Sequence, residues 1–212
     1  MTTPHEVSWG DQGKIMSLAA LPKCVIALTW LVAFAVSVQA QQSTFPNLKK
    51  YKNNLAPYVV APERAVDKML AIANLRPGET LYDLGCGDGR ILIAAAEKYD
   101  AKAVGIEIGE SLAQKAADNV RKHGLENQVK VIHGDFMATD LSAANVVTLY
   151  LAPIANDTLR PNLERYLRPH SRVVSYDYPI PGWKAIDTET SHGHHGDTHM
   201  IYLYEVPDSL KK

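Results

Sequence analysis

Apolar residues recur along this chain in two patterns that alternate. In one pattern they fall three and four positions apart, as on one face of a helix. Val66, Met69, Leu70 and Ala73 are an example, and Pro62 before them suits the first turn of a helix. In the other pattern a short apolar run stands between turn residues, which is typical of a strand.

The two patterns alternate from residue 62 to residue 206, as in an α/β domain. The last two strands follow one another without an intervening helix, so we predict that they form a hairpin. Helices are predicted at residues 62–73, 91–98, 111–123 and around 159–166. Strands are predicted at residues 80–84, 103–108, 129–133, 145–151, 172–176, 183–188 and 199–206.

The first forty residues are a different kind of sequence. Residues 24–38 are almost wholly apolar, Lys14 and Lys23 precede them, and Val38-Gln-Ala40 resembles a small-residue cleavage site. The apolar run has the length of a signal-peptide core and is short for a membrane span. We therefore predict that residues 1–40 are a signal peptide or a membrane anchor, with a buried helix as the alternative.

This segment sets the predicted layout of the chain. It implies an exported or membrane-associated protein, with membrane contact through residues 18–38, and the flanking lysines leave the side of the membrane open. Residues 41–54 are polar and are predicted to be a linker. Residues 55–207 form the folded domain, and residues 208–212 form a tail.

Composition narrows the partners of this domain. The 212 residues include 22 Lys and Arg against 23 Asp and Glu, a net charge of −1. Such a balance gives no broad attraction to nucleic acid, and we expect no nucleic-acid partner. With only Cys24 and Cys86 in the chain, no disulfide framework is indicated.

The most specific signal is the loop Asp83-Leu-Gly-Cys-Gly-Asp-Gly-Arg90, which joins the first predicted strand to the next helix. A strand that turns on glycines into a helix brings backbone N–H groups up to a ligand. The spacing is G-x-G-x-G, whereas a dinucleotide site reads G-x-G-x-x-G, which argues against a nicotinamide oxidoreductase. The loop resembles the first motif of class I S-adenosylmethionine-dependent methyltransferases. The predicted cofactor contacts of this loop are Asp83, Gly85, Cys86, Gly87 and Gly89, with Cys86 filling space rather than reacting.

Further acids follow the ends of predicted strands, where ligands of open α/β sheets bind. Glu107 ends the second strand and can accept both ribose hydroxyls of S-adenosylmethionine. Asp135 follows the third strand and can accept from the adenine amino group, with Phe136 as an apolar wall. Asp83 can face the methionine ammonium, directly or through water.

Motifs flanking the glycine loop carry a narrower resemblance. Together they resemble a small family of class I protein-lysine methyltransferases, whose members include the mitochondrial enzymes that modify adenine nucleotide translocase and the c-type ring protein of ATP synthase. The resemblance implies a Rossmann-like α/β fold: a seven-stranded, mostly parallel sheet with a C-terminal antiparallel hairpin and helices on both faces. It also implies a protein substrate that presents a lysine, possibly a membrane protein. The motifs are residues 57–59, 83–91, 151–153, 172–175 and 181–183.

The acceptor side should lie after the fourth strand. Many amino-methylating relatives have Asn or Asp followed by Pro-Pro there, whereas this chain has Tyr150-Leu-Ala-Pro153, which argues against base-methylating nucleic-acid enzymes. Tyr150 is the catalytic candidate, orienting an amine by its hydroxyl or its ring face, with packing as the alternative. Tyr58 is the second catalytic candidate, as an aromatic wall. Trp183 is a further candidate for which packing is favoured.

We therefore predict methyl transfer from S-adenosylmethionine to an acceptor, with a protein lysine amine expected. A small-molecule acceptor and a noncatalytic cofactor-binding module are the alternatives. Residues 191–199 contain four histidines and an aspartate, a tract that could bind zinc, nickel or copper. Its glycines and irregular spacing favour a hairpin loop, and no metal site is predicted.

Overall fold

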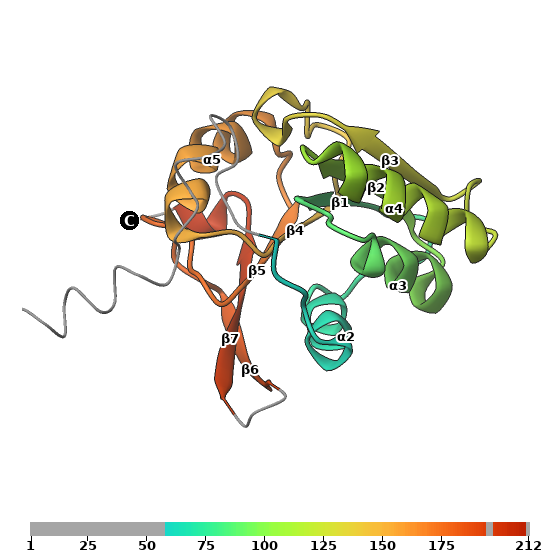
Figure 1. The fold of residues 1–212 in the computed structure, drawn as a ribbon. Helices are drawn as coiled ribbons and strands as arrows, with labels where there is room; N and C mark the ends of the chain where they lie inside the picture. Colours follow the sequence, from blue (N-terminus) through green and yellow to red (C-terminus); the bar gives the residue numbers. More distant parts are fainter. Residues whose placement is uncertain (1–57, 194–196, 211–212) are drawn as a thin grey trace, which may run out of the picture. The chain divides into compact units, whose positions relative to one another are not determined.

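A computed structural model describes residues 58–193 and 197–210 of the chain (Figure 1). These residues belong to one compact unit that spans residues 47–212. The predicted signal peptide or anchor at residues 1–40 and the predicted linker at residues 41–54 lie outside the described residues.

Seven strands form one sheet in the order β3-β2-β1-β4-β5-β7-β6. The first five strands are parallel, and β7 pairs antiparallel with both β5 and β6. The predicted Rossmann-like α/β fold with a C-terminal antiparallel hairpin is confirmed. The strands are β1 Thr80–Leu84, β2 Lys102–Glu107, β3 Val129–His133, β4 Val146–Leu149, β5 Arg172–Tyr176, β6 Asp187–His192 and β7 Thr198–Glu205.

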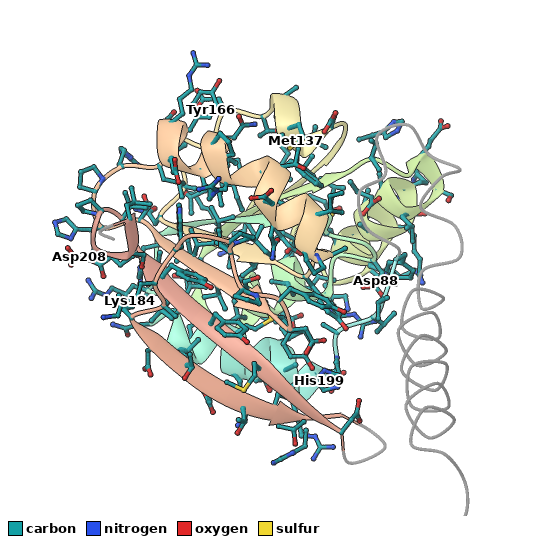
Figure 2. The ribbon with its side chains drawn as sticks, turned by 90° about the vertical axis from the view of Figure 1, so that its left-hand side faces the viewer. Asp88, Met137, Tyr166, Lys184, His199 and Asp208 are labelled. Carbon is teal, nitrogen blue, oxygen red and sulfur yellow. The ribbon has the colours of Figure 1, made fainter. Side chains whose placement is uncertain are left out.

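Helices cover both faces of this sheet (Figure 1). On one face α2 (Glu63–Ile72), α3 (Arg90–Tyr99) and α4 (Glu110–Lys122) bury their apolar sides in one core cluster. On the other face α5 (Pro153–Tyr166) and the short 3₁₀ helix η4 (Phe136–Ala138) pack into a second cluster. Figure 2 marks this second face by Tyr166 of α5 and Met137 of η4.

The chain reverses its direction of travel across the sheet between β1 and β4. It moves outward from β1 through β2 to β3, and then returns to place β4 on the other side of β1. Ligands of open α/β sheets bind outside the carboxyl ends of the strands at such a switch point. The glycine loop follows β1 directly, so the fold places it at this crevice.

The sixth strand lies later than the sequence predicts. It spans Asp187–His192 rather than residues 183–188, and Trp183 instead precedes it, buried and edge-on to Tyr204 with ring centroids 5.7 Å apart. As the edge strand, β6 pairs only with β7 and keeps mostly polar side chains, so it lacks the apolar run of a buried strand. The apolar residues before it fill the core beside the sheet.

Residues 208–210, predicted as part of a tail, belong to the folded domain. They form the 3₁₀ helix η5 (Asp208–Leu210), and Ser209 is fully buried. The Glu205 N–H donates to the Ser209 hydroxyl at 3.0 Å, and the Lys184 N–H donates to the Ser209 carbonyl at 3.0 Å.

Candidate active site

The glycine loop curls back over the end of β2. The N–H groups of Gly85 and Cys86 both donate to the Ile106 carbonyl, at 2.8 and 3.1 Å. Gly85, Gly87 and Gly89 have φ angles of +81°, +55° and +82°, the left-handed region in which glycine carries no steric cost. Three left-handed residues within five positions explain why this turn needs its glycines.

Tyr58 covers the loop from the N-terminal side. A Cβ placed on Gly87 would lie 2.5 Å from the Tyr58 ring, so only glycine allows this close approach. Burial raises the pKa of the Tyr58 phenol, and the neighbouring Asp88 carboxylate adds to the shift. Arg90 pairs with Asp88 at 2.7 Å and donates to the Ala61 carbonyl at 2.9 Å, which ties the segment after Tyr58 to the loop.

Glu107 ends β2 beside the loop and is 7% exposed. Its Oε2 accepts the Gly87 N–H at 3.0 Å, and its Oε1 accepts the Gly109 N–H at 2.9 Å. These two bonds fix the carboxylate against the glycine loop. Each carboxylate oxygen has two lone pairs, so each retains a lone pair that can accept a hydroxyl.

Asp83 is almost fully buried at the end of β1. Its Oδ1 accepts the Thr148 hydroxyl at 2.8 Å, and no ion pair engages it among residues 58–193 and 197–210. Burial raises the pKa of Asp83 to about 7, and Glu107 and Asp88 add to the shift. A buried carboxylate in such surroundings fits a ligand with an ammonium group.

Asp135 and Phe136 follow β3 with different surroundings. Asp135 caps η4, because its Oδ1 accepts the Met137 N–H at 2.8 Å. Phe136 is buried in the core under α5 rather than standing free as a wall. Cys86 is also buried, its pKa is raised by burial, and its Sγ lies 2.6 Å from where a Cβ on Gly105 would be. Packing accounts for Cys86, as the sequence predicts.

Tyr150 follows β4 and faces the neighbouring strand rather than the glycine loop. Its ring meets Tyr176 edge-on, with centroids 4.7 Å apart. Burial raises the pKa of the Tyr150 phenol, and the Asp177 carboxylate adds to the shift. Tyr58 and Tyr150 thus have different neighbours: the first borders the glycine loop, and the second borders the end of β5.

Sequence reasoning missed Asp177 and considered His199 only within a possible metal-binding tract. Asp177 follows β5, just as Glu107 and Asp135 end or follow their strands. His199 comes to the same edge because β7 runs antiparallel to β5. The His199 Nδ1 lies 2.7 Å from Asp177 Oδ1, and its ring stacks on Tyr176 at 5.4 Å. The same strand-end rule could have found Asp177.

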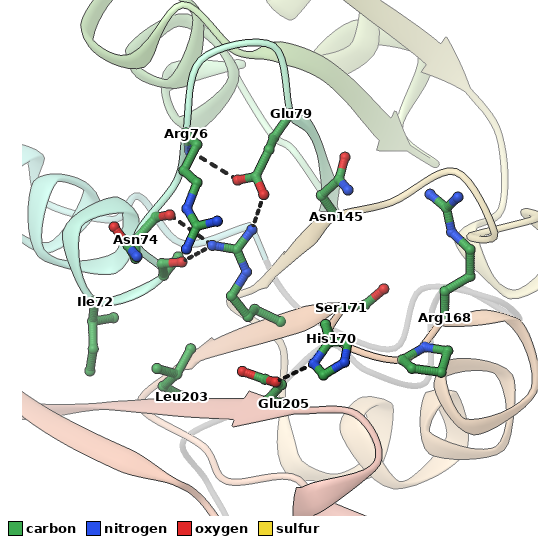
Figure 3. Close-up of a pocket in the computed structure, with 13 residues that line it drawn as sticks. Ile72, Asn74, Arg76, Glu79, Asn145, Arg168, His170, Ser171, Leu203 and Glu205 are labelled. Atoms are coloured by element: carbon green, nitrogen blue, oxygen red, sulfur yellow. Dashed lines mark hydrogen bonds and ion pairs between the residues drawn. The ribbon is translucent and has the colours of Figure 1, made fainter.

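A cavity of about 680 Å³ lies at the opposite edge of the sheet, where the parallel strands begin (Figure 3). Its most buried cation, Arg172, donates to the carbonyls of Ala73 and Asn74 at 2.6 and 2.7 Å and pairs with Glu79. These bonds fasten the end of α2 to β5. None of the predicted site residues lines this cavity, so it is separate from the glycine-loop site.

The histidine tract is only partly described, because residues 194–196 lie outside the described part of the chain. Within the described part, no group of three or more His, Cys, Asp or Glu residues is arranged to hold a metal ion.

Comparison with known proteins agrees with this arrangement. A family model described as the ANTKMT methyltransferase domain matches residues 83–187. A protein-lysine N-methyltransferase from Saccharolobus islandicus is 40% identical over 154 residues, which cover 71% of this chain and 93% of that protein. The adenine nucleotide translocase lysine N-methyltransferase of Mus musculus is 33% identical over 153 residues, 72% of this chain and 64% of that protein. This chain therefore spans less than two thirds of the mouse protein.

A solved structure is also similar over the whole domain. It is named as an RNA methyltransferase from Salinibacter ruber in complex with S-adenosyl-L-homocysteine. It is 39% identical with a TM-score of 0.65, and the match covers 73% of this chain and 100% of that chain. The demethylated cofactor in that relative agrees with the glycine cradle and the buried Asp83 carboxylate of this chain.

The predicted location of the protein needs correction. The Saccharolobus relative is matched over 93% of its length, so it has almost no room for a targeting segment outside the shared domain. Within residues 58–193 and 197–210, no helix has the length and apolar character needed to cross a membrane. Residues 18–38 themselves lie outside the described residues. The prediction of an exported or membrane-associated protein is therefore wrong.

Sequence, fold and relatives converge on one assignment. The relatives share the glycine-loop domain, and the fold is the seven-stranded sheet that the sequence resemblance implies. The cofactor is S-adenosylmethionine, as in these relatives, and its predicted contacts gather at the switch point of the sheet. The chain belongs to the ANTKMT methyltransferase family of class I S-adenosylmethionine-dependent methyltransferases.

Proposed function

We propose that this chain methylates the Nζ amine of a protein lysine. The observation that carries the proposal is the chemistry of the acceptor side, where β4 and β5 end. There Tyr150 and Tyr176 present aromatic rings, and the Asp177 carboxylate lies beside them. Aromatic faces and a carboxylate attract a cationic amine. The protein-lysine methyltransferase from Saccharolobus, 40% identical to this chain, supports the same acceptor.

We propose that the cofactor lies across the carboxyl ends of β1 and β2. Asp83 would face its ammonium, and the N–H groups of the glycine loop would surround its backbone. Glu107 would accept its ribose hydroxyls, and Asp135 would accept from its adenine. When bound, the cofactor supplies an electrophilic methyl group on a sulfonium.

The protein's own task is then to align and deprotonate the acceptor. Alignment of a nucleophile with a methyl group contributes several kcal/mol in favourable cases. Partial burial beside Tyr150 disfavours a charged amine and so helps the lysine lose its proton. We propose that the Tyr150 hydroxyl orients the neutral amine toward the methyl group.

RNA is the competing acceptor, because the Salinibacter relative is named as an RNA methyltransferase at 39% identity. Two features of this chain favour protein over RNA. Its net charge of −1 gives no general attraction to a polyanion. The Tyr150-Leu-Ala-Pro153 sequence also differs from the Asn-Pro-Pro type of lip found in many base-methylating enzymes.

A membrane protein is the finer proposal for the substrate. The mouse relative is named for adenine nucleotide translocase, and a human relative, 31% identical, is named for the c-type ring protein of ATP synthase. Both named targets are membrane proteins. We propose that membrane fractions are the first place to search for the acceptor of this chain.

The test is methylation of a cell lysate by the full-length chain with radiolabelled S-adenosylmethionine. Membrane and soluble fractions are labelled separately, and each is then divided between protease and nuclease treatment. Gly87→Ala, in which the new Cβ meets the Tyr58 ring, serves as the cofactor-site control. We expect the label to be lost to protease and to be absent with the control. Label that is lost to nuclease and survives protease would favour the RNA acceptor instead.

A further inference from the structure

Asp177 has a backbone conformation that residues other than glycine rarely adopt. Its φ is +66°, and the Tyr178 N–H donates to the Tyr176 carbonyl at 2.9 Å across it. Asp177 is therefore the central residue of a three-residue turn, a strained geometry when φ is positive. Glycine would relieve the strain. An aspartate in this place indicates that its carboxylate has a use that offsets the cost.

Neighbouring elements hold this turn in place. The Asp177 N–H donates to the Met200 carbonyl at 2.7 Å, which fixes the turn to β7. Asn156 of α5, itself fully buried, donates to the Tyr178 carbonyl at 3.0 Å. The Ile180 N–H donates to the Tyr204 hydroxyl at 3.0 Å. The Asp177 carboxylate is thus carried on a rigid part of the fold.

His199 links Asp177 to a second carboxylate. Its Nδ1 lies 2.7 Å from Asp177 Oδ1, and its Nε2 lies 2.7 Å from Asp197 Oδ2. A ring with a carboxylate at each nitrogen has the geometry of an imidazolium, in which both nitrogens donate. The two carboxylates then keep one net negative charge while His199 is protonated, and two when it is neutral. The side chains of Asp177 and His199 are 18% and 22% exposed, so solvent and small ions can reach them.

Around this pair the described neighbours are uncharged. Tyr176 stacks on the His199 ring, Ser191 pairs with His199 across β6, and the Tyr150 phenol borders Asp177. The charge available to a ligand therefore comes from Asp177 and Asp197 and is set by the protonation of His199.

We propose that Asp177 binds the ammonium group of the methyl acceptor, and that His199 is a positioning residue whose protonation controls how strongly it does so. The inference rests on the proposed function, since it names the receptor for the lysine. The ligand class is a primary alkylammonium ion. Tyr150 and Tyr176 supply ring faces beside the carboxylate.

Ammonium binding and protonation of His199 oppose each other, because both place a cation on Asp177. Burial lowers the pKa of His199, but its bonds to Asp177 and Asp197 outweigh burial and hold that pKa above its usual value. His199 therefore loses its extra proton as the pH rises through this raised pKa, and ammonium affinity increases over the same range. By linkage, bound ammonium lowers the pKa of His199 by the same factor.

Proton NMR of the histidine rings tests this without turnover. The full-length chain is saturated with S-adenosylhomocysteine and titrated with pH in n-butylammonium chloride, or in sodium chloride at equal ionic strength. We expect n-butylammonium to lower the pKa of His199 by a coupling of about fivefold or more. His170, paired with Glu205 at 3.0 Å at the opposite edge of the sheet, is the internal control and should not respond.

Asp177→Asn is the matched variant, because asparagine tolerates a positive φ and preserves the turn. In this variant the response of His199 to n-butylammonium should disappear while S-adenosylhomocysteine affinity is unchanged. A His199 pKa that is equal in the two salts, or a response that persists in Asp177→Asn, would overturn the inference.

Kinetics with poly-L-lysine separate this inference from the proposed function. Asp177→Asn should raise KM about tenfold or more with a smaller change in kcat. His199→Gln should remove the dependence of KM on pH near the pKa of His199, and His170→Gln should match the parent. If the parent methylates no lysine while n-butylammonium still lowers the pKa of His199, the proposed function fails and the ammonium site stands. Parent-like KM in Asp177→Asn would overturn the inference while leaving lysine methylation intact.

Discussion

Replacing Asp83 by asparagine tests the electrostatics of the cofactor site. Burial raises the pKa of Asp83 from 3.8 in the unfolded reference to about 7 in the fold. An acid whose pKa is raised by folding stabilises the fold fully only below its unfolded pKa, and the contribution is lost as the pH rises through the folded value. The loss is about 1.4 kcal/mol per pH unit. From about pH 5 to about pH 8 it amounts to about 3 kcal/mol, because it stops at the folded pKa.

The asparagine variant lacks this titration and still accepts the Thr148 hydroxyl, which lies 2.8 Å from Asp83 Oδ1. The difference in unfolding free energy between variant and parent should therefore move in the variant's favour by about 3 kcal/mol between about pH 5 and about pH 8. Urea unfolding of the cofactor-free chain, followed by circular dichroism, measures it. A difference that is the same at both pH values would refute the raised pKa.

Cofactor binding should respond in the opposite sense. The ammonium of S-adenosylhomocysteine pairs with ionised Asp83, so the parent's affinity should rise about eightfold from about pH 6 to about pH 7.5. Above that range the ligand's own amino group begins to lose its proton, near a pKa of about 8. Calorimetric titration of Asp83→Asn should give weaker and pH-independent binding. Equal affinity in the folded variant would contradict the ammonium assignment.

Three further substitutions address the remaining site residues. Glu107→Ala should weaken S-adenosylhomocysteine binding by about 1–3 kcal/mol in calorimetry, because it removes the proposed ribose acceptors and the partner of two backbone N–H groups. Gly87→Ala should abolish measurable binding, and adding Tyr58→Ala should restore part of it, since the ring that blocks the new Cβ is gone but the φ of +55° remains. No recovery in the double variant would place the cause in the backbone alone. Tyr150→Phe should lower kcat with little change in cofactor affinity, as measured by methyl transfer to poly-L-lysine and by calorimetry; parent-like turnover would remove the role of the hydroxyl.

Most of the fold follows from local pattern. Strands β1 to β5 are buried in a parallel sheet, so each reads as a short apolar run between turn residues. The glycine loop and Glu107 were found because a parallel sheet forces ligand contacts to the carboxyl ends of its strands. The edge strand β6 escaped the same rule, because a strand with one neighbour and a solvated face needs few apolar residues.

The acceptor side was harder to foresee for a different reason. Asp177 and His199 are 22 positions apart and meet only because β7 runs antiparallel beside β5. No local pattern encodes that pairing. Phe136 illustrates the reverse error: its position after β3 pointed to the ligand, whereas its side chain turns into the core beneath α5. Strand-end position predicts where a residue lies but not where its side chain points.

The central claim, methyl transfer to a protein lysine, is tested most directly by locating the transferred group. The full-length chain is incubated with a membrane fraction and S-adenosylmethionine that carries a deuterated methyl, and tryptic peptides are sequenced by tandem mass spectrometry, with Gly87→Ala as the control. We predict deuterated methyl on the Nζ of lysine in one or a few proteins, and none with the control. Deuterated methyl found only on nucleic acid or on small molecules would contradict the claim.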